Sequence, residues 1–391
     1  MSKVIKKQIG VAGNRRFVAL DSLRGIAACL VAVGHLGPQT PLTTSLFFAN
    51  TFYLVDFFFV LSGFVICWNY EHRLGTLANI RAFAILRIGR LYPLHFSMLV
   101  AFLALDAFQF FFYPHLLAST PFTGHRVLAA LPENLLLIHA MPFGFGLSWN
   151  VPSWSISTEL WAYLTYALIC STVGARLSYF IVATPILAAL FFFGTNGVEA
   201  TIVFGFFARC LAGFFLGVIV CHIFKRLIEV VISRWIMTIA ECTTFGAILL
   251  LAALSSEWSY LIHIFTAACV LAYAFDQGLI SALLRLPAFQ FLGKISYSIY
   301  MVHYFVPGLT RIAVNYTRDH LGVDLWLAGT SGGVYGRFTG ESFIFVMIFL
   351  ALTIALSYLT YRFIEVPGRD FSRCIVMRSG KTVGLRAIAN S

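Results

Sequence analysis

Residues 17–36 read FVALDSLRGIAACLVAVGHL, an apolar stretch interrupted by Asp21, Arg24 and His35. Twenty residues of α-helix span about 30 Å, the thickness of the hydrocarbon core of a bilayer. A basic segment before an apolar stretch is also typical of a secretory signal peptide, but a charge in the middle of that stretch is unusual there. The stretch therefore predicts a first transmembrane helix.

Similar apolar stretches recur along the 391 residues, of which 60% are hydrophobic and only 11% are charged. A soluble domain carries about 25% charged residues. The length of the stretches fits helices and not the alternating pattern of a membrane β-barrel. We expect an all-α, polytopic transmembrane helical bundle of about ten spans. The further spans are predicted at 47–68, 92–113, 153–173, 177–194, 201–221, 236–254, 259–275, 295–313 and 342–362.

The distribution of basic residues predicts the topology. With the N-terminus in the cytoplasm, 21 of the 27 Lys and Arg residues fall on the inner side, four fall on the outer side and two lie within spans. Such a bias sets the orientation of membrane proteins. We expect cytoplasmic N- and C-termini, with a basic N-terminal segment (1–16), a transmembrane domain (17–365) and a basic C-terminal tail (366–391).

The net charge of +11 does not indicate a nucleic-acid partner, because the basic residues lie between apolar segments and not on one water-facing surface. The eight cysteines are scattered, and no CxxC pair occurs. This pattern indicates neither a disulfide framework nor a zinc site, so the sequence predicts no bound metal.

Two connections on the predicted outer side are long. The connection 114–152 contains an apolar run, 127–141, that is too short and too broken to span, so we interpret it as re-entrant or interfacial. The connection 314–341 is rich in Gly and polar residues. Long loops on one face commonly build binding sites.

Arg24 and His35 are eleven residues apart, which is three helical turns, so both point in the same direction about 16 Å apart along the axis. Charged residues inside a span are costly and mark functional sites. The alternative is that each side chain extends toward its nearer membrane surface.

Asp56 is a lone carboxylate in an otherwise apolar span and needs a partner, for which Arg24 is the expected candidate. This could be a buried ion pair with a purely structural role. The neighbouring Ser62-Gly63 pair favours close helix packing.

Arg87 and Arg90 are three residues apart, on one helical face just before the predicted third span, with Pro93 placed to start that span. Two such arginines can bind phosphate groups. Membrane orientation alone could also explain them.

Glu159 lies near the outer start of the fourth predicted span, at a depth similar to that of His35, and could orient its imidazole. Alternatively it caps a helix N-terminus. His303 and Arg209 are further polar residues within spans, and either could pair across helices.

Six short motifs occur together in the order of one known family. They are LDSLRG with Arg24-x10-His35, DFFFVLSGF from Asp56, the Arg87-x-x-Arg90 element, Trp154-Ser155-x-Ser157-x-x-Glu159, ISYSIY-x-x-His303 and Phe363-Ile364-Glu365-x-Pro367. In these the chain resembles the membrane acyltransferase-3 family, which are integral membrane O-acyltransferases that modify bacterial polysaccharides and nodulation factors.

The resemblance implies a multi-pass protein of the bacterial inner membrane, an acyl-CoA donor such as acetyl-CoA, and a carbohydrate acceptor. That acceptor would be a polysaccharide, a lipid-linked oligosaccharide or a glycoside. His35 would be the general base with Glu159 orienting it, and Arg24 and Asp56 would support the catalytic helix. Arg87, Arg90 and Arg24 would bind the donor. The remaining implied residues, which would bind substrate, are Trp154, Ser157, Tyr300 and His303.

The chain departs from the family pattern at Leu160, where members often carry a second acidic residue, so a two-carboxylate scheme is not expected. It also ends soon after the last predicted span, so we expect no esterase-like domain. A homodimer is possible. The alternative function is a transporter or flippase of a glycan precursor, with the buried charged residues as a relay. The lack of an internal repeat weakens that alternative.

Overall fold

The computed structural model describes residues 15–36, 43–112, 122–142, 144–194, 199–254, 261–322 and 339–379. Within these ranges every regular element is a helix and no strand occurs, so the all-helical prediction is confirmed there. The α-helices are α2 (Val18–Gly34), α3 (Leu46–Ala49), α4 (Leu54–Tyr70), α5 (Leu77–Phe112), α6 (Leu131–Leu135), α7 (Trp154–Thr172), α8 (Leu177–Gly194), α9 (Glu199–Leu227), α10 (Arg234–Ala253), α11 (Ile262–Phe275), α12 (Leu279–Leu284), α13 (Pro287–Lys294), α14 (Ser296–Val302), α15 (Val306–Leu321), α16 (Thr339–Thr360) and α17 (Val366–Ser379). The 3-10 turns are η2 (Thr51–Tyr53), η4 (Gly124–Arg126), η5 (Leu128–Ala130) and η6 (Val151–Ser153), and η8 (Tyr361–Glu365) is a π-helical turn.

Several helices of the described residues could cross a membrane. Five segments are long and apolar enough by length and composition, namely Leu46–Tyr70, Leu77–Phe112, Gly205–Leu227, Arg234–Ala253 and Phe343–Arg378. Helices also lie at the other predicted positions, and two of them are shorter apolar helices. The molecule is therefore an integral membrane protein in character, while the count of ten spans and the side of the termini stay predictions.

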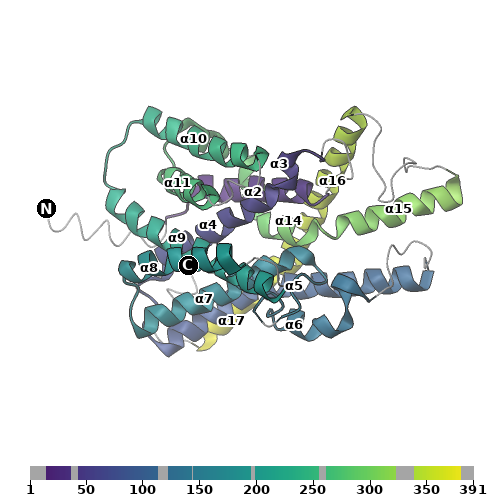
Figure 1. Cartoon of the computed structure of the whole chain (residues 1–391), viewed down its shortest axis with the longest axis horizontal. Coiled ribbons are helices and arrows are strands. Elements are labelled where there is room, and N and C mark those ends of the chain that lie inside the picture. Colours follow the sequence, from purple (N-terminus) through teal and green to yellow (C-terminus); the bar gives the residue numbers. More distant parts are fainter. Residues whose placement is uncertain are drawn as a thin grey trace.

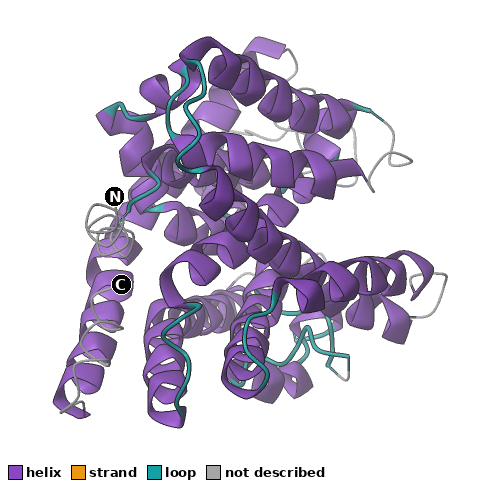
Figure 2. Cartoon of the chain, turned by 90° about the vertical axis from the view of Figure 1, so that its left-hand side faces the viewer, coloured by secondary structure: helices purple, strands orange, loops and turns teal. Residues whose placement is uncertain are grey.

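The bundle is built around α2, α4 and α9. In Figure 1, α2 and α4 lie at the centre, with α10 and α11 on one side and α5, α7 and α17 on the other. Turning the molecule by 90° shows helices packed side by side, with loops at their ends (Figure 2). Most residues of α2 and α4 are buried, which is expected of central helices that are apolar on nearly every side. Polar side chains on these two helices therefore face the protein interior.

The most extensive helix contact joins α4 and α9, and glycines let the two backbones approach. A Cβ atom on Gly63 would collide with the backbone of Phe214, and one on Gly217 would collide with the carbonyl of Val60. Small residues let two helix backbones approach in a membrane, where packing and not hydrophobicity drives association. The prediction that the Ser62-Gly63 pair allows close helix packing is thus confirmed for Gly63.

The predicted start of the third span is wrong. Pro93 does not begin a helix but lies inside α5, which already starts at Leu77. A proline removes one backbone hydrogen bond without ending the helix when the surrounding packing is strong. Here Pro93 packs against Gly368 of α17, and α5 and α17 lie along each other. Arg87 and Arg90 consequently sit within a continuous helix and not in a loop.

The predicted helix 295–313 is in fact broken. Its first part, α14, ends at Val302, and α15 begins at Val306, so His303 lies at the break. Pro307, in the first turn of α15, has no N–H to donate to the preceding turn, and this favours a new helix start.

The chain from α16 to α17 runs on through the π-helical turn η8, which contains Glu365. Such turns often accompany functional residues because they redirect one side chain. Residues 366–379 of the predicted tail form helix α17, and the rest of that tail, with residues 1–14, lies outside the described residues.

The outer connection contains no spanning helix in the part that is described. Residues 122–142 form η4, η5 and α6 with turns between them, which agrees with an interfacial or re-entrant segment. His95 and Ser157 bind backbone carbonyls of this segment, at Asn134 (2.8 Å) and Leu137 (2.7 Å). The predicted binding loop 314–341 falls largely outside the described residues.

Candidate active site

Arg24 joins α2 to the start of α14. Its Nε donates to Ser296 Oγ (2.8 Å), one terminal nitrogen donates to the Gly293 carbonyl (3.2 Å), and Asp21 forms an ion pair at 3.4 Å. The backbones of α2 and α13 touch here, because a Cβ on Gly25 would collide with the α13 backbone. Arg24 is therefore fixed in place before any ligand binds.

The expected pairing of Arg24 with Asp56 is wrong. Asp56 is fully buried and pairs with Arg209 of α9, through Nε to Oδ1 and Nη2 to Oδ2 at 2.8 Å each. His263 lies 3.5 Å from the same carboxylate. Arg24 instead faces the region of Ser62, six residues or about 9 Å further along α4. The prediction that Arg209 could pair across helices is thus confirmed.

A cavity of about 80 Å³ lies between α2, α4, α5, α7 and α14, and we call it the inner cavity. It brings together Arg24, Arg87, Arg90 and Glu159 from four different helices. Apolar side chains of α4, together with serines and tyrosines of α4, α7 and α14, line most of the rest. The sequence placed each of these four residues at a candidate site, and the fold gathers them into one.

Glu159 lies in the inner cavity among the arginines. Its Oε1 accepts hydrogen bonds from the hydroxyls of Ser62 and Tyr163. Both hydroxyls also lie within hydrogen-bond distance of each other, at 3.3 Å. Glu159 is therefore the carboxylate that shares the inner cavity with Arg24, Arg87 and Arg90.

The two arginines of α5 have different surroundings. Arg87 is 9% exposed, donates to the Tyr70 hydroxyl (2.9 Å) and stacks over the Tyr70 and Phe83 rings. Arg90 makes no hydrogen bond or ion pair within the described part of the chain, although Glu159 and Glu365 lie within electrostatic reach. Arg87 is therefore held by protein, whereas the Arg90 guanidinium is available to a ligand.

A second cavity, of about 370 Å³, adjoins the inner one, and we call it the mouth. The two share six lining residues, which include Arg24, Arg90 and Tyr297. The basic residues that line the mouth are Arg15, Arg16, Arg24, Arg90, Lys294 and Arg369, against the acidic Asp21 and Glu365. A cleft with this excess of one charge attracts anions.

His35 lies at the C-terminal end of α2 beside a second histidine. Its Nδ1 is 2.9 Å from the Val31 carbonyl, which accepts only an N–H, so Nε2 carries the lone pair. The ring centroids of His35 and His303 are 4.9 Å apart. His303 is fully buried, and its Nε2 has no hydrogen-bond partner within the described ranges.

Glu159 does not orient His35, contrary to expectation. The partners of Glu159 are Ser62 and Tyr163, whereas the neighbours of His35 are His303 and Tyr304. His35 lies beyond the lining of the inner cavity. Equal depth along two helix axes does not place two side chains together, because it says nothing of the direction in which each points.

Tyr300 connects the inner cavity to the histidine pair. Its hydroxyl accepts from Ser155 Oγ (2.8 Å) and donates to the Pro152 carbonyl (3.0 Å), and its ring lies 5.8 Å from that of His303. It also lines the inner cavity. Ring contacts through Tyr300 and His303 therefore link the lining of the inner cavity to His35.

The other two predicted substrate-binding residues lie elsewhere. Trp154 stacks on Phe206 (4.6 Å) and lies under the Arg209 guanidinium. Ser157 is fully buried and donates to the Leu137 carbonyl. Neither lines the inner cavity, and both hold neighbouring segments in place.

Sequence reasoning missed four residues of the site. Tyr163 stands four residues after Glu159, a spacing that puts both on one helix face and could have indicated it. Ser62, Ser296 and Glu365 lie in recognised motifs, but only the fold brings them near the arginines.

The fold and cavities define a membrane-embedded helical protein with a basic, anion-accepting site. Residues 17–362 match the family of the acyltransferase domain Acyl_transf_3, and the chain belongs to this acyltransferase-3 family. No solved structure matches it.

Three relatives illustrate the match. The chain is 32% identical to "Acyltransferase MdmB" of Streptomyces mycarofaciens over 39% of each chain, and 34% identical to "Protein 2 in picA locus" of Rhizobium radiobacter over 39% of this chain and 81% of that one. It is 24% identical to "Putative O-acetyltransferase SACOL0978" of Staphylococcus aureus (strain COL), over 91% of this chain and 58% of that one. The match thus spans less than two thirds of two of these relatives. The family and two of these names refer to acyl transfer, and the comparisons do not favour a transporter or flippase.

Proposed function

We propose that the protein is an O-acyltransferase of a bacterial inner membrane that moves an acyl group, acetyl in the simplest case, from acyl-CoA to a carbohydrate hydroxyl. Family membership supports acyl transfer. The observation that carries the donor assignment is the basic mouth that opens into the inner cavity. The acceptor is a polysaccharide, a lipid-linked oligosaccharide or a glycoside.

The charge of the cavities suits acyl-CoA. The phosphates of CoA are anionic, and Arg and Lys bind them through charge-assisted hydrogen bonds. Arg15, Arg16 and Lys294 line only the mouth, while Arg24 and Arg90 line both cavities. The pantetheine arm is long and uncharged, so in this proposal it runs from the mouth toward the inner cavity past Leu61, Val65 and Tyr297, which line both cavities.

His35 is the general base of the proposed reaction. As the acceptor oxygen attacks the thioester carbonyl carbon, its proton passes to Nε2 of His35. The C–S bond then breaks, and the CoA thiolate takes that proton. The products are the acylated carbohydrate and free CoA. Because Nδ1 is bound to the Val31 carbonyl, the imidazole is already in the tautomer that can accept a proton at Nε2.

A variant of this mechanism has His35 act as the nucleophile, so that Nε2 is acylated first and the carbohydrate then takes the acyl group. Both routes use the same atom, Nε2 of His35. Acid quenching with acetyl-CoA alone distinguishes the two routes, because only the variant leaves an acylated histidine that mass spectrometry detects.

The test uses purified protein in lipid vesicles with acetyl-CoA and a cell-envelope glycan extract. Free CoA and acylated glycan are both measured. We expect the His35→Ala variant to lose turnover by about 10²–10⁴-fold while acetyl-CoA still binds. The matched control is His320→Ala, which changes an exposed histidine of α15 that packs on Tyr316.

Undiminished turnover in His35→Ala would remove His35 as the base. Acetyl-CoA that fails to bind the wild type would remove CoA as the donor. Acylation of the glycan from another thioester would then keep acyl transfer and reassign the donor.

A further inference from the structure

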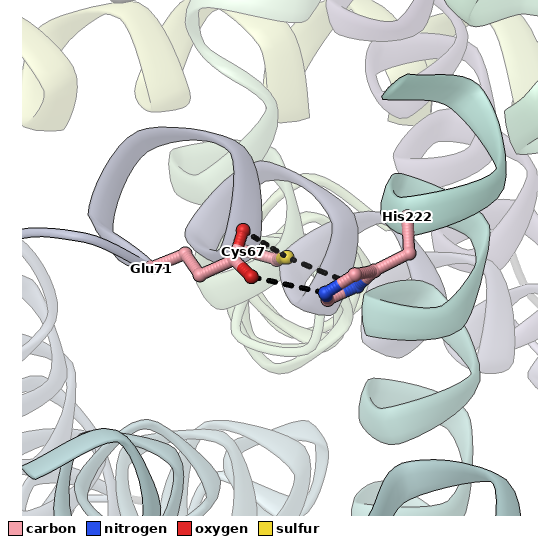
Figure 3. A group of neighbouring side chains, drawn as sticks. All are labelled: Cys67, Glu71 and His222. Atoms are coloured by element: carbon pink, nitrogen blue, oxygen red, sulfur yellow. Dashed lines mark hydrogen bonds and ion pairs between the residues drawn. The ribbon is translucent and has the colours of Figure 1, made fainter. Parts of the chain in front are cut away.

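Three potential metal ligands meet at one end of the α4 and α9 contact. Cys67 and Glu71 lie one turn apart at the C-terminal end of α4, and His222 lies near the C-terminal end of α9. Figure 3 shows that the three side chains point toward one another across the two helices. The close approach at Gly63 and Gly217 brings these helix faces together.

The distances are short enough for one ion. Cys67 Sγ lies 3.8 Å from Glu71 Oε2, and His222 Nε2 lies 2.9 Å from Glu71 Oε1. The sulfur also lies 3.8 Å from Nδ1 of the same imidazole, so the thiol is next to the ring, and the ring has to turn for Nε2 to share an ion with the sulfur. One ligand atom from each residue lies within 4.8 Å of the others. Ligand atoms around a tetrahedral zinc ion are roughly 3.3–3.6 Å apart, so a separation of 4.8 Å has to close by about 1.2 Å to complete the geometry.

The tautomer of His222 indicates that a cation belongs between the ligands. Its Nδ1 is 2.9 Å from the Val218 carbonyl, so Nδ1 carries a proton. In the neutral ring the Nε2 lone pair then faces a carboxylate oxygen, and two lone pairs repel each other. Only a second proton or a metal ion makes this contact favourable. A carbonyl bound to the other ring nitrogen is the usual support of a histidine that binds metal.

We propose that Cys67 Sγ, the Glu71 carboxylate and His222 Nε2 bind a zinc ion that clamps α4 to α9. The thiolate, imidazole and carboxylate form a donor set that suits zinc, with water at the fourth position. Cys67 is fully buried, and Glu71 and His222 are partly buried, so the site lies at the edge of the bundle.

Sequence spacing pointed away from this site, because the cysteines lack a CxxC pair. Two ligands lie four residues apart on α4, and the third lies on a different helix, 155 residues from Cys67. A pattern search cannot join such positions. The proposal does not depend on acyl transfer, and its test measures metal.

Lys225 is the competitor at this site. Its ammonium forms an ion pair with Glu71 Oε2 and therefore occupies the same carboxylate. If zinc binds, Lys225 weakens it, and the Lys225→Met variant should bind zinc more tightly. If an imidazolium and an ammonium simply neutralise Glu71, the same variant gains no metal affinity.

The experiment titrates cobalt, a zinc substitute with visible spectra, into the purified full-length protein after treatment with a chelator. We expect one equivalent per chain, with a thiolate-to-cobalt charge-transfer band that zinc abolishes. Cys67→Ser should remove the band, and His222→Gln should weaken zinc binding by more than the 10–100-fold typical of lost supporting contacts. The control is Cys269→Ser, which changes a buried cysteine of α11.

The proposal is overturned if the wild type and Lys225→Met both show no thiolate band, or if the band persists in Cys67→Ser. Should Cys67→Ser fail to fold, the wild type still decides the matter. If the proposal holds, zinc raises the unfolding temperature of the wild type. It raises the unfolding temperature of Lys225→Met at a lower zinc concentration than the wild type needs.

Discussion

The Arg209 guanidinium of α9 binds the Asp56 carboxylate of α4 through two parallel hydrogen bonds of 2.8 Å in a region where both side chains are buried. The rings of Phe52, Trp154 and Phe191 surround the guanidinium. Two opposite charges thus share a desolvated site, where each one alone is very unfavourable.

We expect Asp56→Ala and Arg209→Ala each to lower stability by about 3–5 kcal/mol, because each leaves an unpaired buried charge. The double variant Asp56→Leu with Arg209→Leu should be more stable than either single variant. Thermal unfolding in detergent measures this. A double variant that is less stable than both would show that the pair is itself a net source of stability.

Removing the Arg90 side chain should weaken binding of the donor phosphates. In Arg90→Ala we expect the KM for acetyl-CoA to rise about 10–100-fold, the value of one charge-assisted contact, with a smaller change in kcat. Acetyl-pantetheine, which lacks the nucleotide, should show almost no difference between the variant and the wild type. Equal losses with both donors would place Arg90 in another role.

Glu159→Gln should have opposite effects on binding and turnover. The carboxylate partly neutralises Arg24, Arg87 and Arg90 in the inner cavity, so its loss makes the cavity more cationic. Acetyl-CoA should bind tighter, by about 1 kcal/mol or roughly fivefold, while kcat falls. Calorimetry and steady-state kinetics measure the two quantities. Weaker binding would mean that Glu159 contacts the donor directly.

His139 should make the protein sensitive to acid. It lies outside the spanning helices, and burial and the neighbouring His95 imidazole lower its pKa to about 3. An unfolded histidine binds a proton below about pH 6.5, and folded His139 does not until about pH 3. Its contribution is therefore full above pH 6.5 and is lost as the pH falls toward 3, by roughly 2 kcal/mol at pH 5.

His139→Gln, which keeps a polar partner for Ser153, tests this acid sensitivity. Its unfolding temperature should fall less than that of the wild type between pH 7 and pH 5. Parallel pH profiles of the two proteins would refute the assignment.

The topology is open to a direct test. Alkaline phosphatase fused after residue 126 should be active, and a fluorescent protein fused after residue 176 should fluoresce, because these loops are predicted outside and inside. Reversed signals would invert the bundle, and matching signals at both sites would change the number of spans.

The helices were predictable because the chain contains apolar segments of spanning length, and so were the individual polar residues that line the inner cavity. Their partners were not predictable. Arg24 and Asp56 are both unusual charges in neighbouring helices, yet an offset of six residues along α4 separates them, and sequence does not give the relative shift of two helices. Glu159 and His35 failed as a pair for a related reason, because rotation about each helix axis decides which cavity a side chain meets.

The predicted helix start at Pro93 was wrong because the prediction considered only the residues next to the proline. Pro93 was expected to start a helix and instead lies within one, since packing against α17 compensates for the lost hydrogen bond. Pro307 does lie at a helix start, and the break before it places His303 beside His35.

The 36 residues of α5 extend about 54 Å, some 24 Å more than the hydrocarbon core of a bilayer. Its N-terminal half, with Arg87 and Arg90, packs with α17, and Arg90 lines the mouth. If this end of α5 stands at a membrane surface, the nucleotide of the proposed donor would stay hydrated there, and only the acylated end of its arm would have to leave water. In the proposed function the protein would therefore act as a short conduit for one small chemical group, and the bilayer would keep its permeability barrier against the rest of the coenzyme.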